Sequence, residues 1–212
     1  MKIYTCYSDS HEVLYRDYFL PSIKPHGWTI DATRVPQLGD GNWSGPGWKN
    51  AVGTKLAIFR RAMDECCGGY WIWSDVDIQY FSDPVPHLLH ELGHYDIATQ
   101  AEFPAPNEKR ECCTGLMIVM ANDRTKQLFD TIEHNYGFFA EDQQVFNHYR
   151  NLCAWKTLSP RFWCKNLSAE PPVDIVSQHA NWMIGVDAKV KALQHIRQLN
   201  ISQSKATIVY TN

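Results

Sequence analysis

The chain has 212 residues, 44% hydrophobic and 13% aromatic, which is enough apolar material for one globular domain (residues 1–212) with a proper core. Its net charge is −3 with no long basic run, which argues against nucleic acid as the main partner. No stretch approaches the about 18 consecutive apolar residues of a membrane-spanning helix, so no transmembrane segment is expected. The N-terminus is typical of a strand rather than a signal peptide, so a complete chain would stay in the cytoplasm.

The first 66 residues predict two strands and two helices. Strands are expected at residues 2–7 and 28–35, and amphipathic helices at residues 9–23 and 52–66. Residues 39–48 are rich in glycine and carry two tryptophans, which is typical of a loop. Such a loop is either a mobile lid or plain surface structure.

An apolar, aromatic run after a Gly-Gly break predicts a buried strand over residues 70–77. It ends in Asp75 and Asp77, and residues two apart on a strand face the same side. Two neighbouring carboxylates repel each other unless a cation or a strong donor lies between them. Hard oxygen ligands suit Mg²⁺ or Mn²⁺, so the pair indicates chemistry on a phosphorylated small molecule. The alternative is a polar strand end that turns into a loop.

The remaining sequence continues the alternation of strands and helices. Strands are expected at residues 95–99 and 112–120, and helices at residues 84–92, 122–136, 142–149 and 187–199, while residues 173–178 lead to His179. This order predicts an α/β fold with a mostly parallel central sheet flanked by helices. Ligands bind such sheets beyond the carboxyl ends of the strands, which is where Asp75 and Asp77 are expected.

Seven cysteines are present, four of them in two adjacent pairs. The spacing of a zinc site is missing, and neighbours on a strand point to opposite faces. We therefore interpret the cysteines as reduced thiols that fill space in the core.

Four sequence blocks, in this order, resemble one protein family: Ser74-Asp75-Val76-Asp77, Cys113-Thr114-Gly115-Leu116, Glu141-Asp142-Gln143-Gln144-Val145-Phe146-Asn147 and Gln178-His179-Ala180-Asn181-Trp182. The family is the GT-A-fold nucleotide-sugar glycosyltransferases, especially the nucleotide-diphospho-sugar transferases. The resemblance covers about residues 1–195 and implies a single GT-A-like, Rossmann-like domain. Cys113 departs from the pattern, because the family commonly has asparagine there.

The resemblance implies a metal site. Asp75, Asp77 and His179 would hold Mn²⁺ or Mg²⁺ against the diphosphate of the donor, and Asp75 would also face the donor itself. Neutral imidazole is a sound ligand for such a cation beside two carboxylates. Taken without its block, His179 would be an ordinary core or surface histidine.

The resemblance also implies catalytic residues. Asp142 would accept a proton from the acceptor hydroxyl or bind sugar hydroxyls, and Gln143 would brace the charge that develops at the anomeric carbon. The alternative for Asp142 is a cap on the helix that begins there.

Donor-binding residues follow from the same comparison. Tyr7 and Ser8 end the first strand, where the fold receives base and ribose. Lys55 and Arg60 precede the aspartate pair on a helix and would reach the diphosphate or the sugar, and Lys189 would contact phosphate. Each of these five has an ordinary alternative: a strand end for the first two, and a solvated basic face for the others.

The expected function is a metal-dependent glycosyltransferase. It would move a sugar from a nucleotide-diphosphate donor, a UDP-sugar, to a hydroxyl of a glycan, lipid or protein acceptor, and analogy favours retention of the anomeric configuration. Two alternatives remain: a sugar-nucleotide or carbohydrate-binding domain without turnover, and a phosphatase of the D-x-D type. The phosphatase would place the pair on the first core strand, whereas other predicted strands and helices precede it here.

Overall fold

The computed structural model describes residues 1–39, 45–103, 111–139, 141–165 and 168–209, with side chains placed up to residue 200. Residues 40–44 of the predicted glycine-rich loop lie outside the described residues. Within the described ranges, no helix combines the length and the apolar character that crossing a membrane requires.

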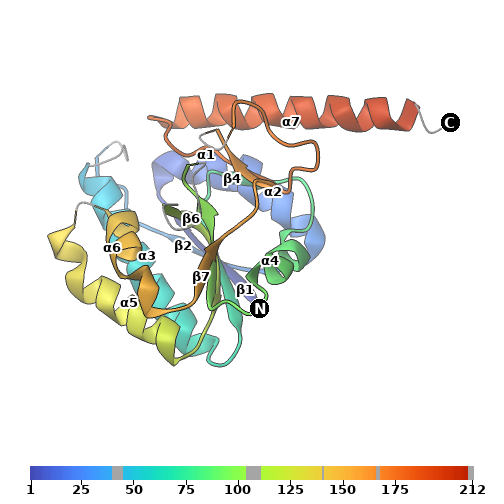
Figure 1. The fold of residues 1–212 in the computed structure, drawn as a ribbon. Coiled ribbons are helices and arrows are strands. Elements are labelled where there is room, and N and C mark those ends of the chain that lie inside the picture. The colour runs from blue at the N-terminus through green and yellow to red at the C-terminus, as the bar shows by residue number, and fades with distance from the viewer. Residues whose placement is uncertain (40–44, 104–110, 140, 166–167, 210–212) are drawn as a thin grey trace.

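A six-stranded sheet forms the centre of the molecule (Figure 1), and its strand order is β2-β1-β3-β6-β5-β7. The strands are β1 (Lys2–Tyr7), β2 (Thr29–Arg34), β3 (Tyr70–Ser74), β5 (Ile97–Ala101), β6 (Cys112–Met120) and β7 (Trp155–Thr157). Only β6 runs antiparallel to its neighbours, and the other pairs are parallel. The prediction of a mostly parallel central sheet is confirmed.

Helices cover both faces of this sheet (Figure 1), with α3 (Pro46–Glu65), α5 (Asp123–Asn135) and α6 (Asp142–Tyr149) on one side and α2 (Leu20–Ile23) and α4 (Pro84–Leu92) on the other. The alternation of β3 divides its side chains between the two layers. Trp71 and Trp73 pack under α3 and α5, whereas Ile72 packs with α4. Burial on both faces explains why this strand is almost wholly apolar.

Residues 9–23 are helical as predicted, but the type of helical turn changes along the segment. A short 3-10 turn (Asp9–His11) leads into α1 (Glu12–Leu14), a π turn (Tyr15–Phe19), α2 (Leu20–Ile23) and a second 3-10 turn (Lys24–His26). Pro21 lies near the start of α2 and has no amide hydrogen to donate backwards. The widened turn before it is the usual way in which a helix absorbs such an interruption.

A second, three-stranded sheet was not predicted. It contains β4 (Ile78–Tyr80), β9 (Ser177–His179) and β8 (Phe162–Cys164), in that order. The final helix α7 (Val186–Val209) packs beside it and buries Leu193 and Ile196. Gln79 ties the sheet to α7 by donating from Nε2 to the Leu193 carbonyl at 2.7 Å.

The cysteines are free thiols in the structure. Cys112, Cys113, Cys153 and Cys164 are buried, as expected of thiols in a core. Cys6 and Cys66 are half-buried and Cys67 is exposed, so the space-filling interpretation holds only for the first four.

Candidate functional site

Asp75 and Asp77 lie in the tight connection between β3 and β4, which joins the two sheets. The prediction placed both on one strand, but β3 ends at Ser74 and the pair belongs to a turn. The Asp75 amide donates to the Gly115 carbonyl at 2.7 Å, and the Ile78 amide donates to the Asp75 carbonyl at 3.3 Å. The backbone of the turn is therefore fixed at both ends.

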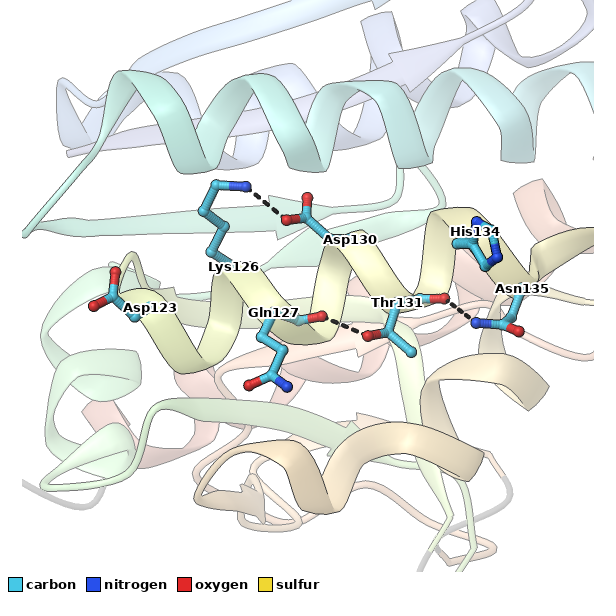
Figure 2. A pocket seen from close by; sticks show the side chains of 7 residues that line it. All are labelled: Asp123, Lys126, Gln127, Asp130, Thr131, His134 and Asn135. Carbon is cyan, nitrogen blue, oxygen red and sulfur yellow. Dashed lines mark hydrogen bonds and ion pairs between the residues drawn. The ribbon is translucent and has the colours of Figure 1, made fainter.

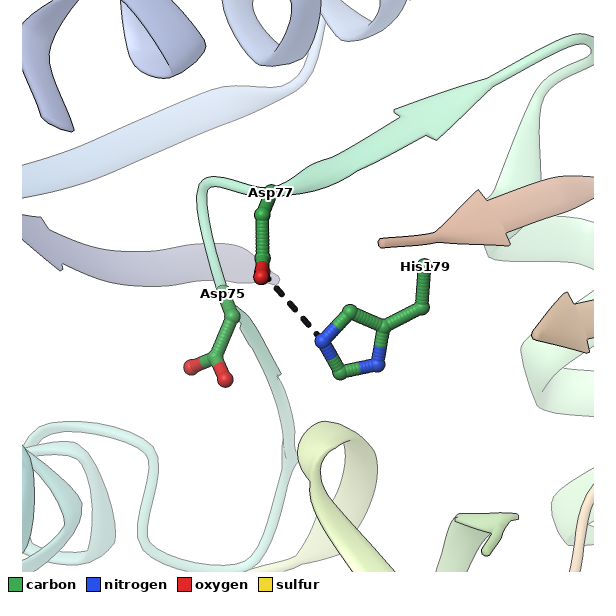
Figure 3. Close-up of side chains that lie close together, drawn as sticks. All are labelled: Asp75, Asp77 and His179. Atoms are coloured by element: carbon green, nitrogen blue, oxygen red, sulfur yellow. Dashed lines mark ion pairs between the residues drawn. The ribbon is translucent and has the colours of Figure 1, made fainter. Parts of the chain in front are cut away.

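His179 completes a three-residue cluster with this pair (Figure 3). One ligand atom from each of Asp75, Asp77 and His179 lies within 4.8 Å of the others. His179 ends β9, where it pairs in register with Ile78, and its Nε2 is 3.2 Å from Asp77 Oδ1. The two sheets thus supply one carboxylate pair and one imidazole to the same point.

The tautomer of His179 suits a cation. Its Nδ1 is 2.7 Å from Gln100 Oε1, an oxygen that can only accept, so Nδ1 carries the proton. The orientation of the Gln100 amide is fixed because its Nε2 donates to the Phe162 carbonyl at 2.9 Å. The lone pair of Nε2 then faces the carboxylates, as in many metal-binding histidines. The residues present fit a divalent metal ion.

The two aspartates differ in charge environment. Burial and the charge of Asp77 raise the pKa of Asp75, although the charge of Lys55 opposes this. Burial also disfavours ionised Asp77, but the nearby positive charge, above all that of Lys189, outweighs it and holds the pKa of Asp77 well below the usual range. Lys189 donates to Asp77 Oδ2 and, at 3.3 Å, to the Ala180 carbonyl. Asp77 is therefore the firmly ionised member of the pair.

Gly115 on β6 has no side chain, and the atoms of His179 and Asp75 occupy the space where a Cβ would lie. A Cβ at this position would lie 2.3 Å from His179 Cε1 and 2.9 Å from Asp75 Oδ2. Both distances are shorter than any ordinary contact with a Cβ, so a larger residue would displace two members of the cluster. Sequence reasoning quoted the block that contains Gly115 but gave the glycine no role.

Lys55 and Asp142 form an ion pair beside the cluster of Asp75, Asp77 and His179. Lys55 of α3 is 7% exposed, and its Nζ lies 3.0 Å from Asp142 Oδ2 and 3.6 Å from Asp75 Oδ1. Thr114 Oγ1 donates to Asp142 at 2.8 Å. Burial opposes both charges, but the mutual attraction prevails, so the pKa of Lys55 is raised and that of Asp142 is lowered. Asp142 is the first residue of α6, and the N-cap position is held by Glu141. Asp142 is therefore not the N-cap residue that the alternative interpretation expected.

These groups share one cavity of about 450 Å³. Every predicted site residue except Arg60 lines it: Tyr7, Ser8, Lys55, Asp75, Asp77, Asp142, Gln143, His179 and Lys189. Tyr7 and Ser8 end β1 at the carboxyl edge of the sheet, as expected. Gly47 and Trp48 also contribute to the wall, and they lie in the first turn of α3 rather than in the loop predicted over residues 39–48.

The structure does not bring Arg60 to the cavity. Its side chain is 60% exposed and pairs with Glu133 of α5 at 2.9 Å. Five positions separate Arg60 from Lys55, which turns its side chain by about 140° around a helix of 3.6 residues per turn. Lys55 therefore faces inward and Arg60 outward, in agreement with the solvated basic face considered above.

Sequence reasoning missed Gln100 and Glu102 as site residues. Glu102 is 1% exposed and lines the cavity, and Gln100 orients His179. A signal was available, because both polar residues follow the predicted strand at residues 95–99 with the same two-residue spacing as Asp75 and Asp77. Strand β5 runs in the same direction as β3, so its carboxyl end lies at the same edge.

Another depression, of about 440 Å³, lies on the outer face of α5 (Figure 2). Its polar groups bond along their own helix. Lys126 pairs with Asp130 at 2.6 Å, and Asn135 donates to the Thr131 carbonyl at 2.8 Å. A solvated helix face explains this depression, whereas the larger cavity collects side chains from several elements.

Comparisons with known proteins identify the family of this chain. The family described as nucleotide-diphospho-sugar transferase matches residues 19–193. A search of curated protein sequences found no match.

Solved structures of similar shape include a glycosyltransferase involved in glycosylation of the major capsid of PBCV-1, with a TM-score of 0.62 and 11% identity over 93% of this chain and 100% of that one. The galactosyltransferase LgtC in complex with donor and acceptor sugar analogues has a TM-score of 0.58 and 10% identity over 95% and 96% of the two chains. GlyE of Streptococcus pneumoniae TIGR4 has a TM-score of 0.54 and 11% identity over 89% of this chain and 58% of that one. At such identities these likenesses establish the GT-A-like fold alone.

Proposed function

This chain belongs to the nucleotide-diphospho-sugar transferase family, and from that premise we propose that it transfers a sugar from a UDP-sugar to a hydroxyl group of an acceptor. The observation that carries the proposal is the meeting of Asp75, Asp77 and His179 in the cavity that also holds Asp142. A cation site beside a buried carboxylate suits a reaction in which a diphosphate leaves and sugar hydroxyls must be held.

Asp75, Asp77 and His179 would hold Mn²⁺ or Mg²⁺. When bound, the cation would neutralise the negative charge that builds up on the leaving diphosphate. Lys189 already contacts Asp77 from the first turns of α7, so its ammonium group lies where it can meet a phosphate oxygen. Tyr7 and Ser8, at the end of β1, would face the base and ribose.

Asp142 and Gln143 would bind the sugar. Lys55 and Thr114 keep Asp142 ionised and fix its orientation, so its carboxylate can accept hydrogen bonds from sugar hydroxyls. Gln143, the next residue of α6, lines the same cavity and would present its amide oxygen to the positive charge at the anomeric carbon. We propose retention of the anomeric configuration, which rests on family resemblance alone, and NMR of the first product formed would test it.

Donor hydrolysis tests the proposed function. Purified protein is incubated with Mn²⁺ and a panel of UDP-, GDP- and other nucleotide sugars, and release of nucleoside diphosphate is measured. We expect release from a UDP-sugar that requires the metal and is lost in Asp77→Ala. Asp130→Ala, in the exposed ion pair of α5, is the matched control and should keep full activity.

Two results would count against the proposal. Tight binding of a nucleotide sugar without release, with every acceptor class added, would favour a binding domain. Failure of the whole panel to bind would reopen the phosphatase alternative, which is assayed with simple phosphate monoesters.

A further inference from the structure

The carboxyl group of Glu102 has no role in the function proposed above, yet it is buried in the same cavity. Its Oε1 accepts hydrogen bonds from the Trp182 indole and, at 3.4 Å, from Asn181 Nδ2. Its Oε2 is buried and has no hydrogen-bond partner of normal geometry among the described residues. Burial raises the pKa of Glu102, and the nearby Cys113 thiol, His179 and Gln143 offset this only in part. Such an orphaned oxygen is costly unless a ligand or water donates to it.

Asn181 also has a buried side-chain oxygen without a hydrogen bond, like Glu102. Its side-chain Oδ1 is also buried without a partner among the residues the structure describes. Asn181 and Glu102 both line the cavity. The site therefore offers two buried acceptor oxygens that receive no hydrogen bond of normal geometry from the described residues.

An aromatic surface lies directly beside these acceptors. Trp182 is 69% exposed although its indole nitrogen is tied to Glu102, so the edge of the ring is fixed while much of the ring stays open. Phe103, 40% exposed, lies with its ring centroid 5.9 Å from that of Trp182. Trp182 has φ of +58°, the only positive φ outside glycine in the described part of the chain. A bulky residue adopts this conformation only where surrounding structure holds it there, and such residues gather at ligand sites.

The polar and aromatic groups of Glu102, Asn181, Trp182 and Phe103 favour some classes of acceptor over others. A ligand must bring hydroxyl donors for two buried oxygens and an apolar face for an aromatic ring. A pyranose ring has both, because its hydroxyls project around the ring edge and its C–H groups lie on its faces, where they can contact the electron-rich face of an indole. An acyl chain has no donors, and the flexible side chain of a serine or threonine has no flat apolar face.

We propose that Trp182, Phe103, Glu102 and Asn181 form an acceptor subsite that binds a pyranose ring, so that the acceptor is the end of a glycan. This inference rests on the proposed function, because it assigns the acceptor of that same site. The pyranose packs against Trp182 while its hydroxyl groups donate to Glu102 and Asn181. The acceptor then enters at the mouth of the cavity that holds the donor residues.

Saturation-transfer NMR with simple glycosides tests the subsite. The probes are the methyl glycosides of β-glucose, β-galactose and α-mannose, each recorded with and without UDP and Mg²⁺. We expect at least one glycoside to receive saturation, mainly at the C–H protons of one ring face. Hexanol and a serine-containing tetrapeptide serve as probes of the lipid and protein classes and should receive none.

Three variants assign the signal to these residues. Trp182→Ala and Glu102→Gln should each weaken glycoside binding about tenfold, while Trp182→Phe, which keeps an aromatic face, should retain more affinity than alanine. Phe138→Ala removes an 84% exposed aromatic residue that does not line the cavity and should change nothing. Thermal unfolding of each variant shows that the fold is kept, and the two Trp182 variants together separate stacking from a folding defect.

Equal glycoside binding by wild type and both Trp182→Ala and Glu102→Gln would overturn the subsite. So would binding of only hexanol or the peptide, or binding of UDP without any glycoside. Calorimetry of UDP with Mg²⁺ is a separate measurement. Its failure would speak against the proposed function, while the glycoside spectra recorded without UDP would still report on the subsite.

Discussion

Glycine at position 115 is required by the space that His179 and Asp75 occupy. The Cβ of Gly115→Ala would lie 2.3 Å from the imidazole and 2.9 Å from the carboxylate, so both ligand groups must move. Because metal sites need their ligands within a few tenths of an ångström of ideal positions, we expect Mn²⁺ affinity to fall about tenfold or more. Titration of bound Mn²⁺ by electron paramagnetic resonance measures this directly.

Gly53→Ala is the matched control. Gly53 lies within α3, and a Cβ there meets nothing within 4 Å. This variant should keep Mn²⁺ affinity and gain about 0.5–1 kcal/mol of stability, because alanine is the better helix former. Equal Mn²⁺ affinity in both variants would show that crowding at Gly115 does not reach the cluster.

Lys55 pairs with the buried carboxylate of Asp142 and with the half-buried carboxylate of Asp75, so Lys55→Met should expose the cost of burying Asp142 without a partner. Removing one partner of a buried ion pair costs about 3–5 kcal/mol, because the remaining charge is left unpaired. Asp142 would then have a folded-state pKa above its unfolded value instead of below it. A raised carboxyl pKa gives stability at low pH that is lost as pH rises, so the variant's loss should be greater at pH 8 than at pH 5. Urea unfolding at the two pH values measures this difference.

Lys126→Met provides the comparison for Lys55. Lys126 pairs with Asp130 on the exposed face of α5, with side chains 52% and 46% exposed. Such surface pairs contribute about 0–1 kcal/mol. A loss in Lys55→Met no larger than this, or one that does not depend on pH, would contradict the role assigned to Lys55.

Sequence reasoning found most site residues because they occur in recognisable blocks at the ends of predicted strands. It failed for Arg60 because the direction of a side chain on a helix depends on how the helix is rotated about its own axis. For α3 this rotation is set by packing on the sheet, which the sequence pattern does not reveal. It failed for Glu102 and Gly115 because their roles depend on contacts with Trp182 and His179, which lie 80 and 64 positions away in the chain. The two-residue spacing after the predicted strand at residues 95–99 could have placed Glu102 at the edge of the sheet, but neither local propensity nor periodicity indicates these long-range contacts.

Asp96 joins three elements at the end of the sheet opposite the cavity. Its buried carboxylate accepts hydrogen bonds from Arg124 at the start of α5, from Asn122, the N-cap of α5, and from the Ala154 amide just before β7. Burial opposes ionisation, but these donors prevail and lower the pKa of Asp96. A lowered pKa means that the stabilisation is present at neutral pH and is lost as pH falls through the folded-state value.

Asp96→Asn should therefore cost about 2–4 kcal/mol at pH 7, since the amide carries no charge and can accept at only one atom. The difference from wild type should shrink as pH falls below about 4, where wild type loses the same charge. Chemical unfolding across pH 3–7 measures both quantities. A difference that stays constant over this range would mean that the charge of Asp96 contributes little.

At the scale of elements, long periodic segments were predicted well and short ones were not. Strands β3 and β6 and helices α4, α5 and α6 were expected within a few residues of their observed bounds. Strands β4, β7 and β8 have three residues each, which is too short for alternation to appear in the sequence. Strand β4 pairs with β9, which lies almost 100 positions further along the chain, so its formation depends on tertiary contacts.

The whole molecule consists of two sheets that meet at the candidate metal site. Asp75 and Asp77 connect β3 of the six-stranded sheet with β4 of the three-stranded sheet, and His179 ends β9 of the latter. Lys189 reaches Asp77 from α7. A cation held by these side chains would link both sheets, while bound nucleotide would add contacts to β1 and α7. Ligand binding should therefore stabilise the junction of the sheets as well as the cavity.

Thermal unfolding with Mn²⁺ and UDP tests this link. A ligand present at 100 times its dissociation constant adds about 2.7 kcal/mol, which for a chain of this size raises Tm by about 5–10 °C. Mn²⁺ and UDP together should raise Tm more than either alone, and hydrogen exchange should slow at the amides of β9 and the first turns of α7. Asp77→Asn should abolish the joint effect, because it removes the firmly ionised ligand, whereas Asp130→Ala should retain it. An equal rise in Asp77→Asn, or slowed exchange confined to β1, would mean that nucleotide binds without joining the two sheets through this cluster.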